Sequence, residues 1–344
     1  MKISLFLPHV GVFGGVRRFI ELGNAWIRTG HDVTLFHPAG TPPEWLPFGG
    51  RVEPLERAGV TDSDLAWCAD PHTFDRFLAH RAGRRVYYVV IERDPALPRV
   101  LERNDVALAA NSTPLRAAVA RRAGRAVLDG IGGIDVARFR PDPARRSAAP
   151  LRVLINGRRS REKKGTDLVL RALLGLGRRT PAFETVLFDS LDAHNRQDPR
   201  DGARLPANAR FVINPSQDQL VALYQSADLF VAAERKAGWC NTALEAMACG
   251  TAVVCTSSGT RDFARHGETA WVVPVRHPLW FRHAIGRVLA DSERRERLGR
   301  AGRTEAERWT WDRLGSKLLA QLGAAPAELV PPGRAAAEGP GAAR

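Results

Sequence analysis

Residues 238–254 read Gly-Trp-Cys-Asn-Thr-Ala-Leu-Glu-Ala-Met-Ala-Cys-Gly-Thr-Ala-Val-Val. This pattern predicts a loop, a short helix over 242–249 and a buried strand over 252–255. Unpaired backbone N–H groups at the start of such a helix suit a phosphate, and the carboxylate of Glu245 suits a neighbouring sugar hydroxyl. The spacing of Thr242 and Glu245 also fits a simple capping box, in which the glutamate only returns a hydrogen bond to the helix start.

Strand-like and helix-like segments alternate on both sides of this stretch, which predicts an α/β fold with mostly parallel sheets covered on both faces. The expected strands are 3–8, 32–36, 65–68, 86–91, 106–110, 151–156, 185–189, 210–213, 229–233, 252–255 and 270–273. The expected helices are 17–28, 74–81, 113–123, 166–176, 217–225, 242–249, 279–290 and a charged helical stretch over 292–321.

Glycines and prolines between Gly130 and Pro150 interrupt this alternation, and we expect a domain boundary there. The predicted domains are residues 1–145 and 146–305. Residues 306–322 are expected to form a C-terminal helix that crosses back to the N-domain. Residues 323–344 consist largely of Ala, Gly and Pro, so we expect a disordered tail.

Composition narrows the classes of protein to which the chain can belong. The net charge of +14 would suit nucleic acid, but the arginines are scattered and lack interleaved aromatic residues, so we expect no nucleic-acid partner. Four separated cysteines without a Cys-x-x-Cys pair predict reduced core thiols and a cytoplasmic protein. No secretory signal and no membrane-spanning run is recognised in the sequence.

Two further loops carry candidate site residues. Gly11-Val-Phe-Gly14-Gly15 follows the first strand and reads as a phosphate-binding turn, or as a tight turn without a ligand. Asn156-Gly-Arg-Arg-Ser-Arg-Glu-Lys-Lys-Gly-Thr-Asp167 follows another strand, and Thr166 or Asp167 is expected to cap the next helix. Arg158 and Lys164 in this loop would neutralise a leaving diphosphate, and a solvated charge run is the competing interpretation.

The run Leu244–Gly250, followed by Val253-Val254, resembles the donor signature of the family 4 glycosyltransferases. The resemblance implies a GT-B fold, in which two Rossmann-like domains face a central cleft. It also implies sugar transfer from a nucleotide-diphosphate sugar with retention of the anomeric configuration, and no metal or other cofactor. In this comparison Arg158 and Lys164 are the catalytic diphosphate clamp, with Lys163 as a competitor. The donor-binding residues it implies are Gly14, Gly15, Asn214, Asn241, Thr242, Ala243 and Glu245, with Glu245 on the ribose.

The chain departs from the family pattern at two places. Ala237 stands where the family usually has a second glutamate that holds the transferred sugar. No histidine follows the strand over 86–91, so His72, Glu92 and Asp94 are the acceptor-side candidates. These departures leave two alternatives open, a catalytically inactive nucleotide-sugar-binding protein and a GT-B sugar-nucleotide epimerase.

The acceptor is predicted to be a small molecule, a glycan or a lipid-linked compound. Arginines at positions 116, 121, 122 and 125, on a helix with Leu115 and Val119, suggest a peripheral contact with the inner face of the membrane. The nucleobase, the sugar and the oligomeric state are not indicated by the sequence.

Overall fold

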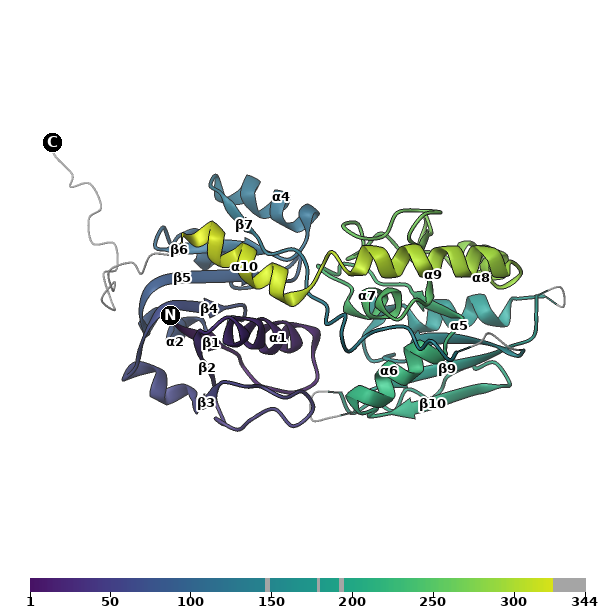
Figure 1. Ribbon diagram of the computed structural model, residues 1–344, viewed down its shortest axis with the longest axis horizontal. Helices are drawn as coiled ribbons and strands as arrows, with labels where there is room; N and C mark the ends of the chain where they lie inside the picture. The colour runs from purple at the N-terminus through teal and green to yellow at the C-terminus, as the bar shows by residue number, and fades with distance from the viewer. Residues whose placement is uncertain (146–148, 178–179, 192–194, 324–344) are drawn as a thin grey trace. The chain divides into compact units, whose positions relative to one another are not determined.

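The computed structural model describes residues 1–344 except 146–148, 178–179, 192–194 and 324–344. The chain forms two compact units, each built around its own sheet (Figure 1). The first unit contains residues 1–110 and 118–128 and the chain from Gly315 onward, and the second contains residues 111–117 and 129–314. Each unit is therefore assembled from more than one segment of the chain.

The first unit holds a seven-stranded sheet in the order β3-β2-β1-β4-β5-β6-β7. Its strands are β1 (Lys2–Phe6), β2 (Asp32–His37), β3 (Arg51–Pro54), β4 (Asp62–Cys68), β5 (Arg81–Val89), β6 (Val106–Ala110) and β7 (Val127–Asp129). Ile3 of β1 lies between Val33 and Leu65, and both pairings are parallel. β1 and β4 are buried along most of their length, as expected of a parallel sheet covered on both faces.

The helices of this half are α1 (Gly14–Arg28), α2 (Phe74–Ala79), α3 (Leu97–Leu101), α4 (Thr113–Ala123) and α10 (Trp311–Leu322), with a 3-10 turn η1 (Leu55–Gly59). α4 and α10 each begin in residues grouped with the second unit. The prediction of a glycine turn over residues 11–15 is wrong at Gly14 and Gly15. Gly14 and Gly15 form the first turn of α1, and neither has a positive φ.

The second unit holds a six-stranded sheet in the order β10-β9-β8-β11-β12-β13. Its strands are β8 (Leu151–Asn156), β9 (Phe183–Asp189), β10 (Ala209–Ile213), β11 (Leu229–Ala232), β12 (Ala252–Cys255) and β13 (Trp271–Val272). Its helices are α5 (Thr166–Leu174), α6 (Gln217–Ser226), α7 (Asn241–Ala248), α8 (Pro278–Leu289) and α9 (Ser292–Ala306), with a 3-10 turn η2 (Glu162–Lys164).

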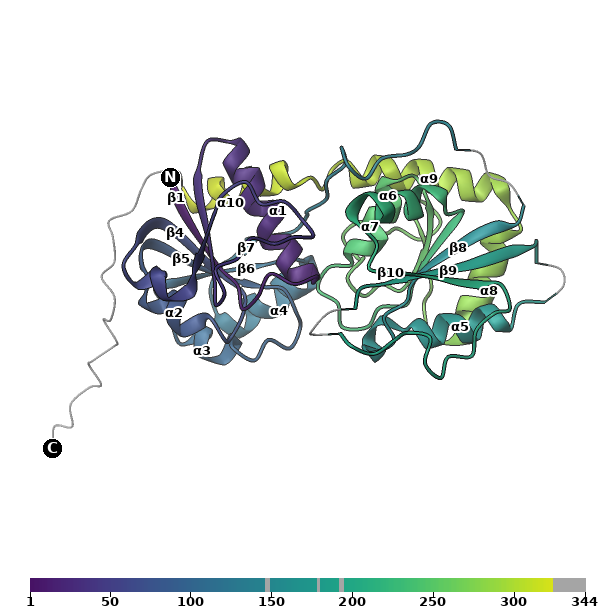
Figure 2. The ribbon, with the colours of Figure 1, turned by 90° about the horizontal axis from the view of Figure 1, so that it is seen from below.

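This sheet separates two apolar cores. Successive side chains of β8 alternate between them, with Val153 and Ile155 in one core and Leu154 in the other. Figure 2 shows α5 and α8 on one side of the sheet and α6 and α7 on the other, in agreement with the two cores. The predicted α/β fold with two mostly parallel sheets is confirmed.

Most of the expected elements are present, with ends shifted by a few residues. β3, β7 and α3 were not predicted, and each is only three to five residues long. The stretch over 292–321 is two helices, because α9 ends at Ala306 and α10 begins at Trp311. The tail expected from 323 onward lies outside the described residues, apart from Gly323.

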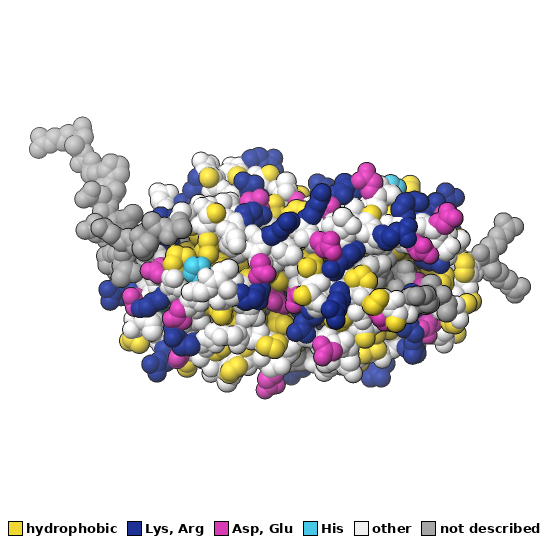
Figure 3. Space-filling view, viewed as in Figure 1, with side chains coloured by type: hydrophobic (Ala, Val, Ile, Leu, Met, Phe, Trp, Pro, Cys, Tyr) yellow, Lys and Arg dark blue, Asp and Glu magenta, His cyan; other side chains and the backbone are white. Residues whose placement is uncertain are grey.

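Two predictions from composition can be compared with the structure. All four cysteines are free and buried, and burial raises the pKa of each thiol to about 12. Lys and Arg side chains alternate with Asp and Glu over the face shown in Figure 3, so this face carries no continuous basic stripe. Among the described residues, no helix combines the length and the apolar character needed to cross a membrane.

The membrane-contact hypothesis for α4 is wrong in its apolar part. Leu115 and Val119 are 5% and 1% exposed, so their side chains belong to the interior and are not available to a bilayer. Only the arginines of this helix remain as candidates for such a contact.

Close packing of α9 on the α7–β12 connection gives a stability test. A Cβ atom added to Gly299 would lie 2.2 Å from the backbone oxygen of Gly250, which cannot move without shifting the loop. We expect Gly299→Ala to destabilise the protein by about 1–3 kcal/mol. Gly286→Ala in α8 is the matched control, because the nearest atom would be 3.5 Å away. It should be neutral or stabilising by up to about 1 kcal/mol, measured by urea unfolding. Equal midpoints for the two variants would contradict this account.

Candidate functional site

Charged side chains gather at the carboxyl ends of the central strands of the second sheet, which is where ligands bind to open α/β sheets. Arg158 follows β8, Asp189 ends β9 and Glu234 follows β11. All three strands are neighbours or next neighbours in the sheet. The topology therefore brings together groups that lie far apart in the sequence.

Arg158 is fixed by three groups of the β8 and β9 ends. Its Nε lies 3.1 Å from Oδ1 of Asp189, and its Nη2 donates to the carbonyl oxygen of Ser190 at 3.0 Å. Its backbone N–H donates to the side chain of Asn156 at 2.9 Å. The arginine side chain is 12% exposed and that of Asp189 is 3% exposed. The guanidinium is thus preorganised by a buried carboxylate.

Lys164 is the second predicted clamp residue, and it also has a buried carboxylate partner. Its Nζ lies 2.5 Å from Oε1 of Glu234, whose side chain is 6% exposed. Burial opposes the charged ammonium, but the carboxylate outweighs this effect and holds the pKa of Lys164 above its ordinary value. Desolvation and the charge of Lys164 lower the pKa of Lys163, whose side chain is exposed.

The loop turns into α5 in a way that the sequence did not predict. Gly165 occupies the cap position with φ 74°, and neither Thr166 nor Asp167 caps the helix. Thr166 instead donates from Oγ1 to the carbonyl oxygens of Asn156 and Arg158, and Asp167 pairs with Arg159. A Cβ atom at Gly165 would lie 2.5 Å from the carbonyl oxygen of Ala233. A glycine is therefore required where this loop crosses the end of β11.

Helix α7 begins one residue earlier than predicted. Its cap residue is Cys240, without a side-chain cap, so Asn241, Thr242 and Ala243 are its first three residues. The buried Oδ1 of Asn241 has no hydrogen-bond partner within the described part of the chain. Cys240, the cap residue, contributes to the raised pKa of Lys164, which indicates that the lysine lies near the start of this helix. The cations of the loop and the unpaired N–H groups at the helix start are thus close together, which favours the binding of an anion.

Glu245 has no capping role, so the capping-box interpretation is wrong. It is 3% exposed, and its Oε2 accepts a hydrogen bond from the Tyr224 hydroxyl at 2.9 Å. Tyr224 comes from α6 and is itself fully buried. The hydroxyl of Tyr224 therefore holds the carboxylate of Glu245 in position.

Asn214 lies at the end of β10 with φ 51°, one of two non-glycine residues with positive φ in the described chain. Its Oδ1 accepts from the backbone N–H of Leu191, and its own N–H donates to the carbonyl oxygen of Asp189. The structure therefore connects Asn214 to the residue that holds Arg158.

Ala237 packs near the Gly259 turn, and its N–H donates to Oγ of Ser258 at 2.9 Å.

The remaining candidates belong to the first unit. A Cβ atom on Gly15 would meet nothing within 4 Å. His72 is exposed, and its backbone N–H donates to Asp70. Glu92 is also exposed. Asp94 is buried and accepts from Tyr87 and from the backbone N–H of Ala96, and burial raises its pKa. Through these contacts Asp94 stabilises its own loop.

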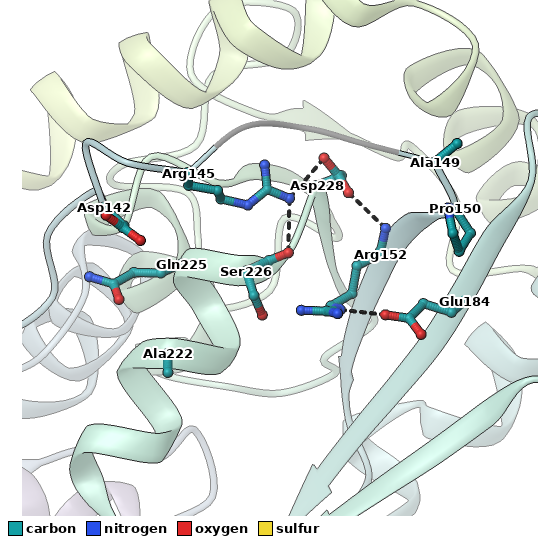
Figure 4. A pocket seen from close by; sticks show the side chains of 10 residues that line it. All are labelled: Asp142, Arg145, Ala149, Pro150, Arg152, Glu184, Ala222, Gln225, Ser226 and Asp228. Atoms are coloured by element: carbon teal, nitrogen blue, oxygen red, sulfur yellow. Dashed lines mark hydrogen bonds and ion pairs between the residues drawn. The ribbon is translucent and has the colours of Figure 1, made fainter.

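The second unit also contains a pocket of about 710 Å³ at the opposite ends of the strands (Figure 4). It lies by the amino ends of β8 and β9, and its charged side chains pair with one another. Arg145 pairs with Asp228 at 2.9 Å, and Arg152 pairs with Glu184 at 2.5 Å. Because ligands bind to open α/β sheets at the carboxyl ends of the strands, and this pocket lies at the amino ends, we do not assign the donor to it.

Three residues of the site were not predicted from the sequence. Asp189 was identified only as the last residue of a strand, and Glu234 was not expected to pair with Lys164. Both residues could have been predicted from their positions at the carboxyl ends of parallel strands, because polar side chains at these positions lie close together. Tyr224 carried no such signal, because it appears in the sequence as an apolar residue of α6.

The second unit is similar to known proteins. Residues 143–305 match the model of the glycosyl transferases group 1 family. This segment, which lies within the second unit, is similar to the group 1 glycosyl transferases. The D-inositol 3-phosphate glycosyltransferase of Salinispora tropica is 31% identical over 221 residues, covering 57% of this chain and 45% of that protein. A GDP-mannose-dependent alpha-(1-6)-phosphatidylinositol monomannoside mannosyltransferase of Mycobacterium tuberculosis is 29% identical over 205 residues, 54% of this chain and 53% of that protein. The chain spans about half the length of these curated relatives.

Solved structures establish the fold over a larger part of the chain. HepE of Anabaena, in complex with UDP and glucose, has a TM-score of 0.74 at 16% identity, covering 94% of this chain and all of that one. The sucrose-phosphate synthase of Thermosynechococcus elongatus has a TM-score of 0.73 at 19% identity, covering 93% and 98%. The chain therefore has the GT-B fold, as the sequence predicted.

The Lys164–Glu234 pair can be tested by its contribution to stability. Glu234→Gln leaves the lysine without a charged partner, and we expect a loss of about 1–3 kcal/mol in the free energy of unfolding. Glu162→Gln is the control on the same loop, because this glutamate is 81% exposed where it pairs with Arg235. The control should change stability by less than about 1 kcal/mol. If chemical unfolding gives the same midpoint for both variants, the buried pair contributes nothing.

Proposed function

We propose that the protein is a glycosyltransferase whose second unit binds a nucleotide-diphosphate sugar at the carboxyl edge of its sheet. The observation that carries this proposal is the convergence of Arg158, Lys164 and the start of α7. Arg158 and Lys164 belong to one loop after β8, and Lys164 pairs with Glu234, which belongs to the segment between β11 and the start of α7. Two cations and a set of helix N–H groups at one place match the charge of a diphosphate.

In this proposal Arg158 and Lys164 stabilise the diphosphate as its bond to the sugar breaks. Their carboxylate partners hold them in position before the donor arrives, so little reorganisation is needed during the reaction. Negative charge on the leaving group is then balanced by protein cations, and we propose that no divalent metal is required. Thr242 and Ala243 contribute backbone N–H groups from the first turn of α7.

Glu245, whose carboxylate is held by Tyr224, is proposed to bind the ribose. Asn241 is proposed to contribute its buried Oδ1 to a hydroxyl or amide donor of the ligand, which would give this atom a partner. Asn214 and its neighbours form the proposed base-binding corner. Gly14 and Gly15 are proposed to contribute to donor binding, as the family resemblance implies.

The acceptor is proposed to bind to the first unit, with His72 and Glu92 as the exposed candidates for acid–base work. The curated relatives act on inositol 3-phosphate and on a phosphatidylinositol mannoside, so compounds that contain inositol phosphate are the first acceptors to try. Retention of configuration follows from family resemblance and is part of this proposal. A cytoplasmic location is proposed from the four free thiols.

Donor binding can be tested by thermal shift with UDP-glucose and GDP-mannose. A donor present at 100 times its dissociation constant should stabilise the protein by about 2.7 kcal/mol. The same donor should stabilise a Glu245→Gln variant much less. A screen in which neither sugar nucleotide nor free UDP or GDP shifts the unfolding temperature would contradict the proposed donor site.

Transfer can be tested with Arg158→Ala, using the donor and acceptor that the binding screens identify. Loss of a preorganised charge should lower kcat by about 10²–10³-fold, measured as acceptor-dependent release of nucleoside diphosphate. Arg161→Ala is the control, because Arg161 is an exposed arginine of the same loop. Near-normal turnover of Arg158→Ala would overturn the catalytic assignment. Donor binding without transfer in the unmodified protein would instead identify an inactive binding protein.

A further inference from the structure

Three large apolar side chains are exposed at the start of α8, in the second unit. Val275, Leu279 and Trp280 are 50%, 55% and 47% exposed. Only three other large apolar side chains in the described part of the chain are comparably exposed, and they lie elsewhere in the sequence at positions 60, 91 and 174. Such a concentration within six residues is unusual for a surface that faces only water.

The exposed face of α8 continues this apolar group with positive charge. Arg282, His283 and Arg287 are exposed, whereas Phe281, Ile285 and Val288 face the core. Residues 269–290 contain no Asp or Glu. We name Val275, Leu279, Trp280, Arg282 and Arg287 the α8 patch.

We propose that the α8 patch docks the protein on an anionic lipid surface. A tryptophan and a leucine beside arginines match the two layers of a membrane interface, where apolar groups enter the acyl boundary and cations remain at the headgroups. Residues 269–290 contribute no carboxylate that would repel anionic headgroups, and the exposed carboxylate of the neighbouring Glu162 pairs with Arg235. The same patch lacks the acidic side chains that would favour a basic partner.

The patch is directly connected to the donor-site loops. Arg276 lies within the apolar stretch, and its Nε donates to the carbonyl oxygen of Ala233 at 2.7 Å. Its Nη2 donates to the carbonyl oxygen of Glu162 at 2.9 Å. The residues that follow these two carbonyls in the chain are Glu234 and Lys163. A bilayer bound at the α8 patch would therefore lie next to these loops, whichever reaction they support.

The experiment is sedimentation of the full chain with vesicles of phosphatidylcholine containing about a third phosphatidylglycerol, compared with pure phosphatidylcholine. We expect binding to the anionic vesicles only, and a decrease of binding at high salt. Arg282→Gln with Arg287→Gln should weaken the partition about fivefold for each arginine removed. Arg297→Gln with Arg300→Gln removes the same charge from exposed positions of α9 and should have a much smaller effect.

The apolar contribution is tested with Leu279→Ser and Trp280→Ser together, which should reduce vesicle binding at least tenfold. Val60→Ser is the control, because Val60 is 82% exposed in the first unit. Circular dichroism melts should be unchanged in all four variants, since every substituted side chain is on the surface. The proposal is overturned if the unmodified chain does not bind anionic vesicles, or if patch and control variants bind equally. It is also overturned if the serine variant changes only the oligomeric state measured by light scattering, which would identify a protein interface.

Discussion

The buried ion pair between Lys164 and Glu234 is the interaction on which the arrangement of the donor-site loops depends. The lysine comes from the turn after β8, and the glutamate comes from the end of β11. Gly165 allows the two backbones to approach, and Arg276 bonds to a carbonyl of each loop. In a partly buried setting, a lysine without this carboxylate would lose much of its tendency to stay charged. The pair therefore fixes both the position and the charge of the cation.

Carboxylate partners have a second effect on the site. Asp189 and Glu234 compensate the charges of Arg158 and Lys164, so the interior of the proposed donor site is close to neutral. Lys163 adds positive charge at its surface. A donor diphosphate would compete with these carboxylates for the same cations. Affinity for the donor is then a difference between two sets of charged hydrogen bonds, which leaves it sensitive to small changes in loop position.

Sequence reasoning predicted the alternating architecture because apolar strands such as β6, β8 and β12 are continuous and bounded by clear turn residues. It also placed Arg158, Lys164 and the α7 segment at one edge, since that follows from parallel topology. It failed for β3 and β7, whose short length gives no periodic signal. It also misassigned the caps of α5 and α7, where tertiary contacts decide what each side chain bonds. Glu245, for example, is bound by a tyrosine that lies 21 positions away in the chain.

The return of the chain to its first unit has a consequence for how the protein is made. The indole N–H of Trp26 in α1, a residue that is 1% exposed, donates to the carbonyl oxygen of Gly315 at 3.1 Å. These two residues are 289 positions apart. During synthesis, the sequence of the second unit has left the ribosome before the segment that covers Trp26 is available. N-terminal domains usually complete their fold first during synthesis. Here the first unit can begin to fold early, but its fold is completed only when the segment around Gly315 has been made.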